Sequence, residues 1–373
     1  MRLRAVVLAL ILGMGAIAPL QSASQPAPTS VVRGRVLDAE TNVPLSDTHV
    51  FIAQTINGTV TDSTGRFRLD GVRPGAKRLV VSRVGHVNEA NTVRLKPGRM
   101  QVFTIRLEPK VLKSPPVTVS AERDEEWYER LDRFKRLFIG ASGHAQKCAL
   151  VNPEVLRFEK KWWGKFKARA EKPLIIENRA LGYRLTYVLK EFEESGPVVR
   201  WDGEPLFEPL TPEDSALAAQ WRKNRREAYR GSIRHFLRAL LDDRLEEEQF
   251  DLYRLPRASA FRYTSRADRM STSRDRILEP GTDSTHLLDT WDRLEVVYRG
   301  ESESEAYLDW ADLRRAPRDV QTSQIELNEH PIHIDPYGKI VEPYGATLYR
   351  YFAFTLRMAN LLPREYEPPD KRQ

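Results

Sequence analysis

Lysines and tryptophans are interleaved in one short segment, residues 160–167, which is the first candidate for a binding surface. Trp162 and Trp163 offer flat faces that stack on sugar rings or nucleobases. Lys161 and Lys165 add positive charges for acidic groups. The segment therefore predicts a surface for a glycan or a polyanion. The competing interpretation, which we favour, is a β-hairpin whose charged side chains line an exposed edge.

Histidine and aspartate side chains come close together at His330, His333 and Asp335. Imidazole and carboxylate groups are ligands that zinc accepts, so this triplet is the candidate metal site. Residues three apart in a strand point to opposite faces, and the two rings would meet only if Pro331 turned the chain. We therefore expect a strand and a turn here, and we assign no metal and no cofactor.

The other reactive side chains have no neighbours in the sequence that would complete a catalytic or metal-binding group. His235 is expected on the polar face of a helix, solvated rather than acting as a general base. Cys148 has apolar neighbours and is expected to be a small buried side chain. His86 and Glu89 have the spacing of zinc ligands, but an extended chain would separate them. Residues 246–248, three glutamates, predict a solvated acidic turn. No catalytic residue is assigned.

Residues 31–108 have the period of β-strands. Apolar and polar side chains alternate over about seven short runs, and turn pairs such as Asn57-Gly58 and Pro97-Gly98 separate them. The segment shows no helical period. This pattern predicts an all-β antiparallel sandwich.

The order of motifs in this segment resembles a known family. Gly34–Asp38, Thr61–Phe67 and Val72–Gly75 together are similar to the carboxypeptidase-regulatory-like domain, a transthyretin-like (prealbumin-like) β-sandwich of exported proteins of the Bacteroidetes type. The resemblance implies a folding and docking module without a catalytic centre of its own. Such modules accompany carboxypeptidases or precede outer-membrane receptor barrels. We expect neither context here, because the residues that follow carry helical periods.

The remaining chain predicts a linker over residues 109–121 and an α+β domain over residues 122–373. Apolar residues at helical spacing predict helices from Trp127 to Phe138 and from Ile233 to Leu241. Thr211–Asp214 is typical of a helix start, with Thr211 as the cap. Strands are predicted around Val155–Phe158, Phe166–Ala170, Leu174–Glu177, Tyr183–Phe192, Leu294–Tyr298, Ile325–Asn328 and Ile332–Ile334. The segment Arg262–Asp283 predicts a loop, and Tyr349–Leu362 fits either a strand or a helix.

Strings in this second half, among them Pro173–Asn178 and Tyr229–Ser232, resemble an uncharacterised class of exported proteins that carry the same sandwich in front. That resemblance implies an architecture and no established reaction. It leaves the function of the α+β domain open.

The start of the chain is typical of a secretory signal peptide. Positive charges in Met1–Arg4 precede the apolar stretch Ala5–Leu20 and the small residues Ser22–Ser24. We expect a cleaved signal over residues 1–24 and a linker over residues 25–30. A retained membrane anchor is the less favoured alternative, because the stretch is shorter than the roughly 20 residues that a span needs.

Composition limits the classes of function. Hydrophobic residues make up 41% of the 373 residues, which favours packed cores over disorder. The net charge is +7, but Lys and Arg are interleaved with Asp and Glu, so we expect no nucleic-acid partner. The single cysteine excludes an intramolecular disulfide.

We therefore expect an exported, non-enzymatic binding or docking protein of the cell envelope, in the periplasm or at the surface of the outer membrane or cell. Its partner would be an envelope protein or a glycan, and its membrane association at most peripheral. The alternative is a hydrolase whose active site assembles from distant residues of the α+β domain, with His235, His330 and His333 as candidates.

Overall fold

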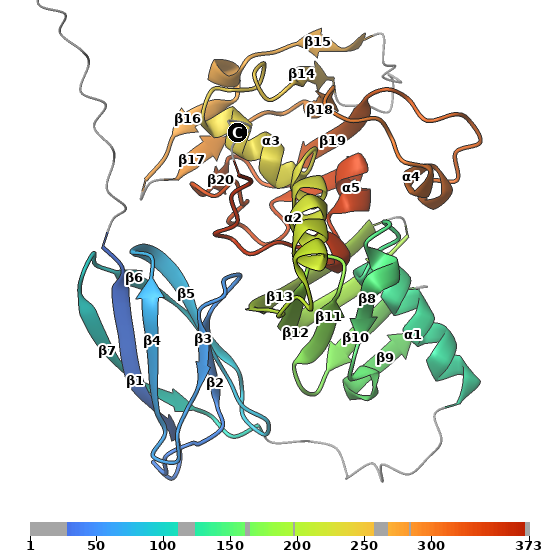
Figure 1. Ribbon diagram of the computed structural model, residues 1–373. Coiled ribbons are helices and arrows are strands. Elements are labelled where there is room, and N and C mark those ends of the chain that lie inside the picture. Colours follow the sequence, from blue (N-terminus) through green and yellow to red (C-terminus); the bar gives the residue numbers. More distant parts are fainter. Residues whose placement is uncertain are drawn as a thin grey trace, which may run out of the picture.

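The computed structural model describes residues 28–110, 124–160, 165–196, 198–256, 268–282 and 285–369 (Figure 1). The predicted signal peptide and most of the predicted linker over residues 109–121 lie outside these residues. Among the helices that are described, none is long and apolar enough to cross a membrane.

The first part of the chain is a sandwich of two sheets. One sheet has the order β4-β1-β7 and the other the order β3-β2-β5-β6. The strands are β1 Ser30–Asp38, β2 His49–Ile52, β3 Gly58–Val60, β4 Arg66–Val72, β5 Gly75–Ser82, β6 Glu89–Leu95 and β7 Met100–Leu107. Alternate residues of both sheets, among them Val32, Val36 and Phe67, form the core between them. The predicted all-β sandwich is confirmed.

One strand pair differs from the antiparallel prediction. β1 and β7 run parallel over their whole length, from Val31 opposite Met100 to Asp38 opposite Leu107. Parallel neighbours need a long connection, and here the other strands of the sandwich supply it. An alternating pattern fixes which face of a strand is buried but not the direction of its neighbour.

The second unit, residues 124–369, begins with the helix α1 Glu125–Phe138, which packs on a six-stranded antiparallel sheet. Its centre is the long hairpin of β12 Tyr183–Ser195 and β13 Val198–Pro209. Along the other edge of β12, β10 Phe166–Ala170 and β11 Leu174–Asn178 lie end to end. The outer strands on this side are β9 Leu156–Lys160 and β8 Cys148–Leu150, and β13 is the edge strand on the opposite side of β12.

Two helices connect this sheet to the rest of the chain. α2 spans Ser215–Tyr229 and α3 spans Ile233–Leu241, with Ser232 capping α3. The predicted cap of α2 is wrong by three residues: the Asp214 carboxylate, not the Thr211 hydroxyl, accepts the Leu217 amide. Aspartate is as good a cap as threonine, so both positions satisfied the pattern.

The last part of the chain forms a five-stranded sheet in the order β15-β14-β18-β19-β21 and a small sheet in the order β16-β17-β20. α3 packs on the larger sheet through Phe236 and Leu240. The elements are β14 Phe250–Leu255, β15 Met270–Ser271, β16 Leu278–Pro280, β17 His286–Leu288, β18 Arg293–Tyr298, α4 Glu305–Trp310, β19 Gln321–Leu327, β20 Ile332–Ile334, β21 Ala346–Arg350 and α5 Tyr351–Thr355. Short 3₁₀ turns lie at Ala145–Lys147, Pro153–Val155, Arg274–Arg276 and Met358–Asn360.

The second unit is therefore a mixed region of sheets and few helices, as the predicted α+β class required. Two details differ from the sequence predictions. The predicted loop over Arg262–Asp283 contains the short strands β15 and β16 in its described part. The ambiguous segment Tyr349–Leu362 ends the strand β21 and then turns into the helix α5.

Candidate functional site

The predicted binding hairpin is described only at its base. Trp162, Trp163 and Lys161 lie outside the described residues. Strands β9 and β10, which flank them, pair antiparallel, with Lys160 opposite Phe166. The fourth predicted residue, Lys165, is held by Glu193, whose Oε1 lies 2.9 Å from the lysine Nζ.

Glu193 therefore supplies a negative charge that pairs with lysines at the base of this hairpin. A second lysine, Lys167, lies 2.5 Å from its other oxygen. The hydrogen bonds from Lys167 and Lys165 lower the pKa of Glu193 to about 2. The charge of Lys165 is thus already balanced within the sheet.

The structure does not bring His330, His333 and Asp335 together as metal ligands. Each makes its own ion pair: His330 Nδ1 with Asp289 Oδ1 at 3.1 Å, His333 Nδ1 with Glu342 Oε1 at 2.5 Å, and Asp335 Oδ2 with Arg364 Nη2 at 2.6 Å. Asp335 also accepts the amides of Tyr337 and Lys339, and so forms the predicted turn. In the described part of the chain, no group of three or more His, Cys, Asp or Glu side chains could hold a metal ion.

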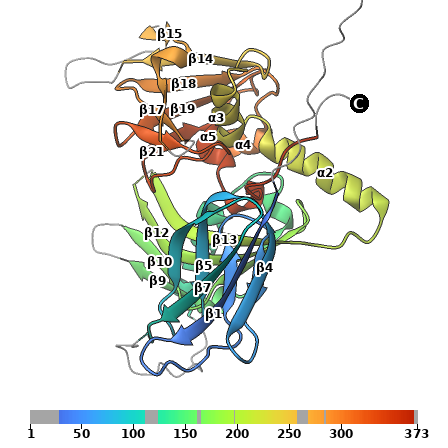
Figure 2. The same ribbon diagram turned by 90° about the vertical axis from the view of Figure 1, so that its left-hand side faces the viewer.

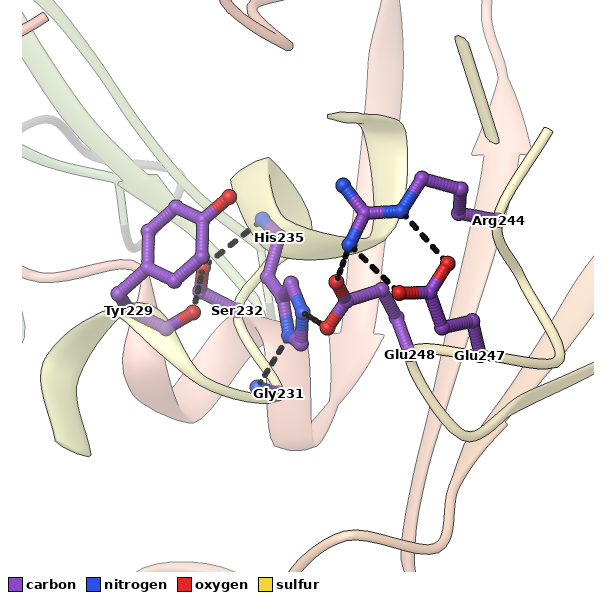
Figure 3. A network of polar contacts seen from close by, with 7 residues as sticks. All are labelled: Tyr229, Gly231, Ser232, His235, Arg244, Glu247 and Glu248. Carbon is purple, nitrogen blue, oxygen red and sulfur yellow. Dashed lines mark hydrogen bonds and ion pairs between the residues drawn. The ribbon is translucent and has the colours of Figure 1, made fainter. Parts of the chain in front are cut away.

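The prediction that His235 is solvated is wrong. Its side chain is buried at the junction of α2 and α3, beside the Tyr229 ring (Figure 3). The rings of Phe250 and Tyr298 also contact it. The polar residues on either side of it in the sequence suggested an exposed face. Aromatic residues from distant strands cover that face instead.

Both ring nitrogens of His235 have defined partners. The Gly231 amide donates to Nδ1 at 3.2 Å, and Nε2 lies 3.1 Å from Glu248 Oε2. Because Nδ1 accepts a hydrogen bond, the ring proton is on Nε2 and is donated to the glutamate. Arg244 holds the other oxygen of Glu248 at 2.6 Å (Figure 3). Residues 246–248 form the predicted turn, with Glu246 and Glu247 exposed, but Glu248 is half-buried and anchors the histidine, which has a structural role.

The remaining candidate residues, Cys148, His86 and Glu89, do not form a shared site. Cys148 is half-buried, and burial raises the pKa of its thiol to about 12, so it stays protonated at neutral pH. His86 Nε2 lies 3.0 Å from Asp38 Oδ2, whereas Glu89 accepts a hydrogen bond from Asn91. His86 and Glu89 therefore do not converge on an ion, as expected.

One contact that the sequence patterns did not predict joins the sandwich to the second unit, and we call it the docking junction. Phe51, Ala53 and Val80 on the outer face of the sandwich pack against Val188 and Leu206 of the β12–β13 hairpin. All five side chains are at most 5% exposed. In Figure 2 the sandwich lies directly against this hairpin.

The docking junction also has backbone hydrogen bonds. The Gln54 amide donates to the Pro205 carbonyl at 2.6 Å, and the Phe207 amide donates to the Thr55 carbonyl at 3.0 Å. From the C-terminal segment, the Arg364 amide donates to the Gln54 carbonyl at 2.6 Å. Bonds of this kind fix a relative orientation, which apolar contact alone does not.

A buried ion-pair group lies at the same place. Glu204, only 3% exposed, binds Arg78 of the sandwich and Lys190 of the sheet. A buried carboxylate is stable only when it is paired, so separating the two units would leave Glu204 with one partner. The sandwich is therefore fastened to its own chain by apolar, backbone and ionic contacts together.

The sequence did carry a signal for this junction. The runs Val50–Ala53 and Leu79–Val81 are apolar without interruption, whereas a strand with one solvated face alternates. Within each run, alternate residues enter the sandwich core, and Phe51, Ala53 and Val80 enter the junction.

A small open pocket of about 40 Å³ lies where the two units meet. Arg83, His86 and Lys110 line it from the sandwich, and Glu171 and Lys172 line it from the sheet. Because both units supply walls, the pocket exists only while they are docked.

Comparisons with known proteins agree with the fold of the first part. No curated protein matches the chain. A type II cohesin–X-dockerin complex of Acetivibrio cellulolyticus is 17% identical over 30% of this chain and 76% of that chain, with a TM-score of 0.19. A proposed carbohydrate binding protein of Bacteroides uniformis is 10% identical over 49% of this chain and 100% of that chain, with a TM-score of 0.20. A membrane-associated protein of unknown function of Bacteroides fragilis is 10% identical over 87% of this chain and 96% of that chain, with a TM-score of 0.18. At these scores the matches carry no argument about function. The model of the carboxypeptidase regulatory-like domain matches residues 31–108. These residues, which fold as the seven-stranded sandwich, are therefore a carboxypeptidase regulatory-like domain.

Proposed function

We propose that the protein is an exported, non-enzymatic binding protein of the cell envelope. The regulatory-like sandwich is its internal docking module, and the second unit binds an envelope glycan or protein. The docking junction is the observation that supports this proposal. In it, Phe51 and Val80 on the outer face of the sandwich hold the second unit in one orientation. A fixed orientation favours binding, because less freedom is lost when the partner binds.

The hydrolase alternative would need two of the candidate histidines at one substrate. The rings of His235, His330 and His333 bind three different carboxylates, Glu248, Asp289 and Glu342. The one basic lone pair of His235, on Nδ1, already accepts the Gly231 amide, and Nε2 faces Glu248, so neither ring nitrogen faces a substrate. This arrangement argues for binding without bond cleavage.

Export rests on the order of residues at the start of the chain and is part of the proposal. Mass spectrometry of the native protein tests it, and we expect a mature N-terminus close to Ser24. A native protein that still contains Met1–Leu20 would show a retained segment instead.

The binding function is tested with the intact protein and an envelope extract from its own cells. Complexes are separated by size, and both the bound component and the unbound extract are analysed by mass spectrometry. We expect a glycan or protein to co-elute with its mass unchanged. Accumulation of shortened glycan or peptide fragments would contradict the proposal and favour the hydrolase.

A further inference from the structure

Trp291 presents a large apolar ring to solvent. It lies in the turn between β17 and β18 and is 69% exposed. The turn itself is ordered: the Thr290 hydroxyl, on a residue only 8% exposed, accepts the Asp292 amide at 3.2 Å. The tryptophan ring is therefore presented on a hydrogen-bonded turn, where a flat ligand surface can stack on it.

One face of the Trp291 ring is already supported. The His330 ring stacks beneath it with a centroid distance of 4.2 Å and an interplanar angle of 14°. His330 is in turn held by Asp289 at 3.1 Å. The indole is therefore fixed in orientation, with one face against the imidazole and the other open.

The groups around the ring decide what fits on the open face. Asp289 binds the imidazole that stacks on Trp291, so its carboxylate, 52% exposed, lies next to the stacked pair. Both carboxylates of the turn have partners, Asp289 with His330 and Asp292 with Arg254 at 3.4 Å. A lipid or an apolar helix would need a wider apolar face, and an anion would meet the exposed carboxylate of Asp289.

A sugar ring combines the two surfaces that this arrangement offers. Its C–H face stacks on an aromatic ring, and its hydroxyls donate hydrogen bonds to carboxylate oxygens. We propose that Trp291, supported by His330 and flanked by Asp289, binds a neutral pyranose ring of an envelope glycan. This site names the ligand class within the proposed binding function and rests on it.

The experiment is a titration of the full chain with neutral tetrasaccharides of glucose, mannose and N-acetylglucosamine, followed by tryptophan fluorescence and calorimetry. We expect at least one tetrasaccharide to bind, and Trp291→Ala to weaken it at least about tenfold. His330→Ala, which removes the supporting ring, should weaken binding less than Trp291→Ala. Tyr128→Ala removes another exposed aromatic ring, 55% exposed on α1, and should leave the affinity unchanged.

Three results would overturn the sugar site. They are equal affinity of the wild type and Trp291→Ala, binding of tetramethylammonium with no tetrasaccharide bound, and no binding of any tetrasaccharide. If an unaltered envelope component still co-elutes with the intact protein, the binding function stands while this site falls. Thermal melting of Trp291→Ala controls for folding, and we expect no change because the ring is exposed.

Discussion

Carboxylates hold the rings of four histidines in place: His86, His235, His330 and His333. His235 is the clearest case, because a backbone amide fixes its tautomer and Glu248 takes its proton as a hydrogen-bond donor. Replacing the ring leaves the Gly231 amide and Glu248 without this partner in a mostly apolar environment. We therefore expect the replacement to lower the free energy of unfolding.

We expect His235→Ala to lower the free energy of unfolding by about 2–4 kcal/mol, from lost packing and unpaired polar groups. Urea unfolding measures it. The control is Glu247→Gln, which alters an exposed carboxylate bound to the same Arg244 and should change stability by no more than about 0.5 kcal/mol. Equal effects of the two substitutions would show that His235 is not a structural anchor.

Asp38 gives the sandwich a predictable response to acid. Hydrogen bonds from the Thr41 amide and from His86 lower its pKa to about 2 in the folded protein, whereas an unfolded aspartate has a pKa of about 3.9. The folded state thus binds fewer protons, so this contribution is present above pH 4 and is lost as the pH falls towards 2. We expect Asp38→Asn to reduce the loss of thermal stability between pH 5 and pH 2.5. An unchanged pH profile, measured by calorimetry, would remove Asp38 as its source.

Sequence reasoning could name these residues but not their partners. His235 and Glu248 are 13 residues apart, and His330 and Asp289 are 41 apart. Such pairs depend on strand order and helix packing, which no local spacing contains. Trp291 was missed for the same reason, because its support comes from the neighbouring small sheet.

At the scale of elements, α2 is fastened to a single turn of the six-stranded sheet. Trp221 Nε1, Asn224 Nδ2 and Arg225 Nε donate to three consecutive carbonyls, of Arg179, Ala180 and Leu181, at 2.7–2.8 Å. The next residue, Gly182, has a φ of +70°, and a Cβ there would overlap the Trp221 ring. This contact positions α2, and through it α3 and the second sheet.

We expect Gly182→Ala to destabilise the protein by more than about 2 kcal/mol, because strain at positive φ adds to the clash with Trp221. Gly71→Ala is the matched control, since its φ is +68° but a Cβ there meets nothing within 4 Å. The control should cost only about 1 kcal/mol. Thermal melting compares them, and equal costs would mean that the α2 contact is not tight.

Most helices and strands could be predicted, because hydrophobic periodicity and helix caps depend only on residues that are close together in the sequence. The helices α1 and α3 and the strands β10 and β12 begin within about two residues of their predicted positions, as expected for such patterns. The parallel pairing of β1 with β7 could not be predicted, because pairing direction depends on the path of the whole chain.

At the scale of the whole molecule, the sandwich and the second unit act together. The order of a regulatory-like domain followed by an α+β region was predictable from motifs and periods. The docking junction was not predicted, although the uninterrupted apolar run Val50–Ala53 carried a signal for it: only Val50 and Ile52 of this run belong to the sandwich core. The residues between them, above all Phe51, are what join the two units.

Leu206→Glu should separate the two units without unfolding either, because it places a charge among Phe51 and Val80. We expect a larger radius of gyration by small-angle X-ray scattering and faster proteolysis near residue 206. Val102→Glu is the control on the other sheet, where Val102 is already 71% exposed, and it should leave both unchanged. An unaltered scattering profile of Leu206→Glu would show that this contact does not hold the units.

Hydrogen exchange at the docking junction tests the central claim, a sandwich that holds the second unit in place, most directly. The amides to follow are Gln54, Phe207 and Arg364, with Val36, bonded to Gly65 inside the sandwich, as the internal reference. We predict slow exchange at all four in the wild type, and fast exchange at the first three alone in Leu206→Glu. Fast exchange of Gln54, Phe207 and Arg364 in the wild type, with Val36 still protected, would contradict the account.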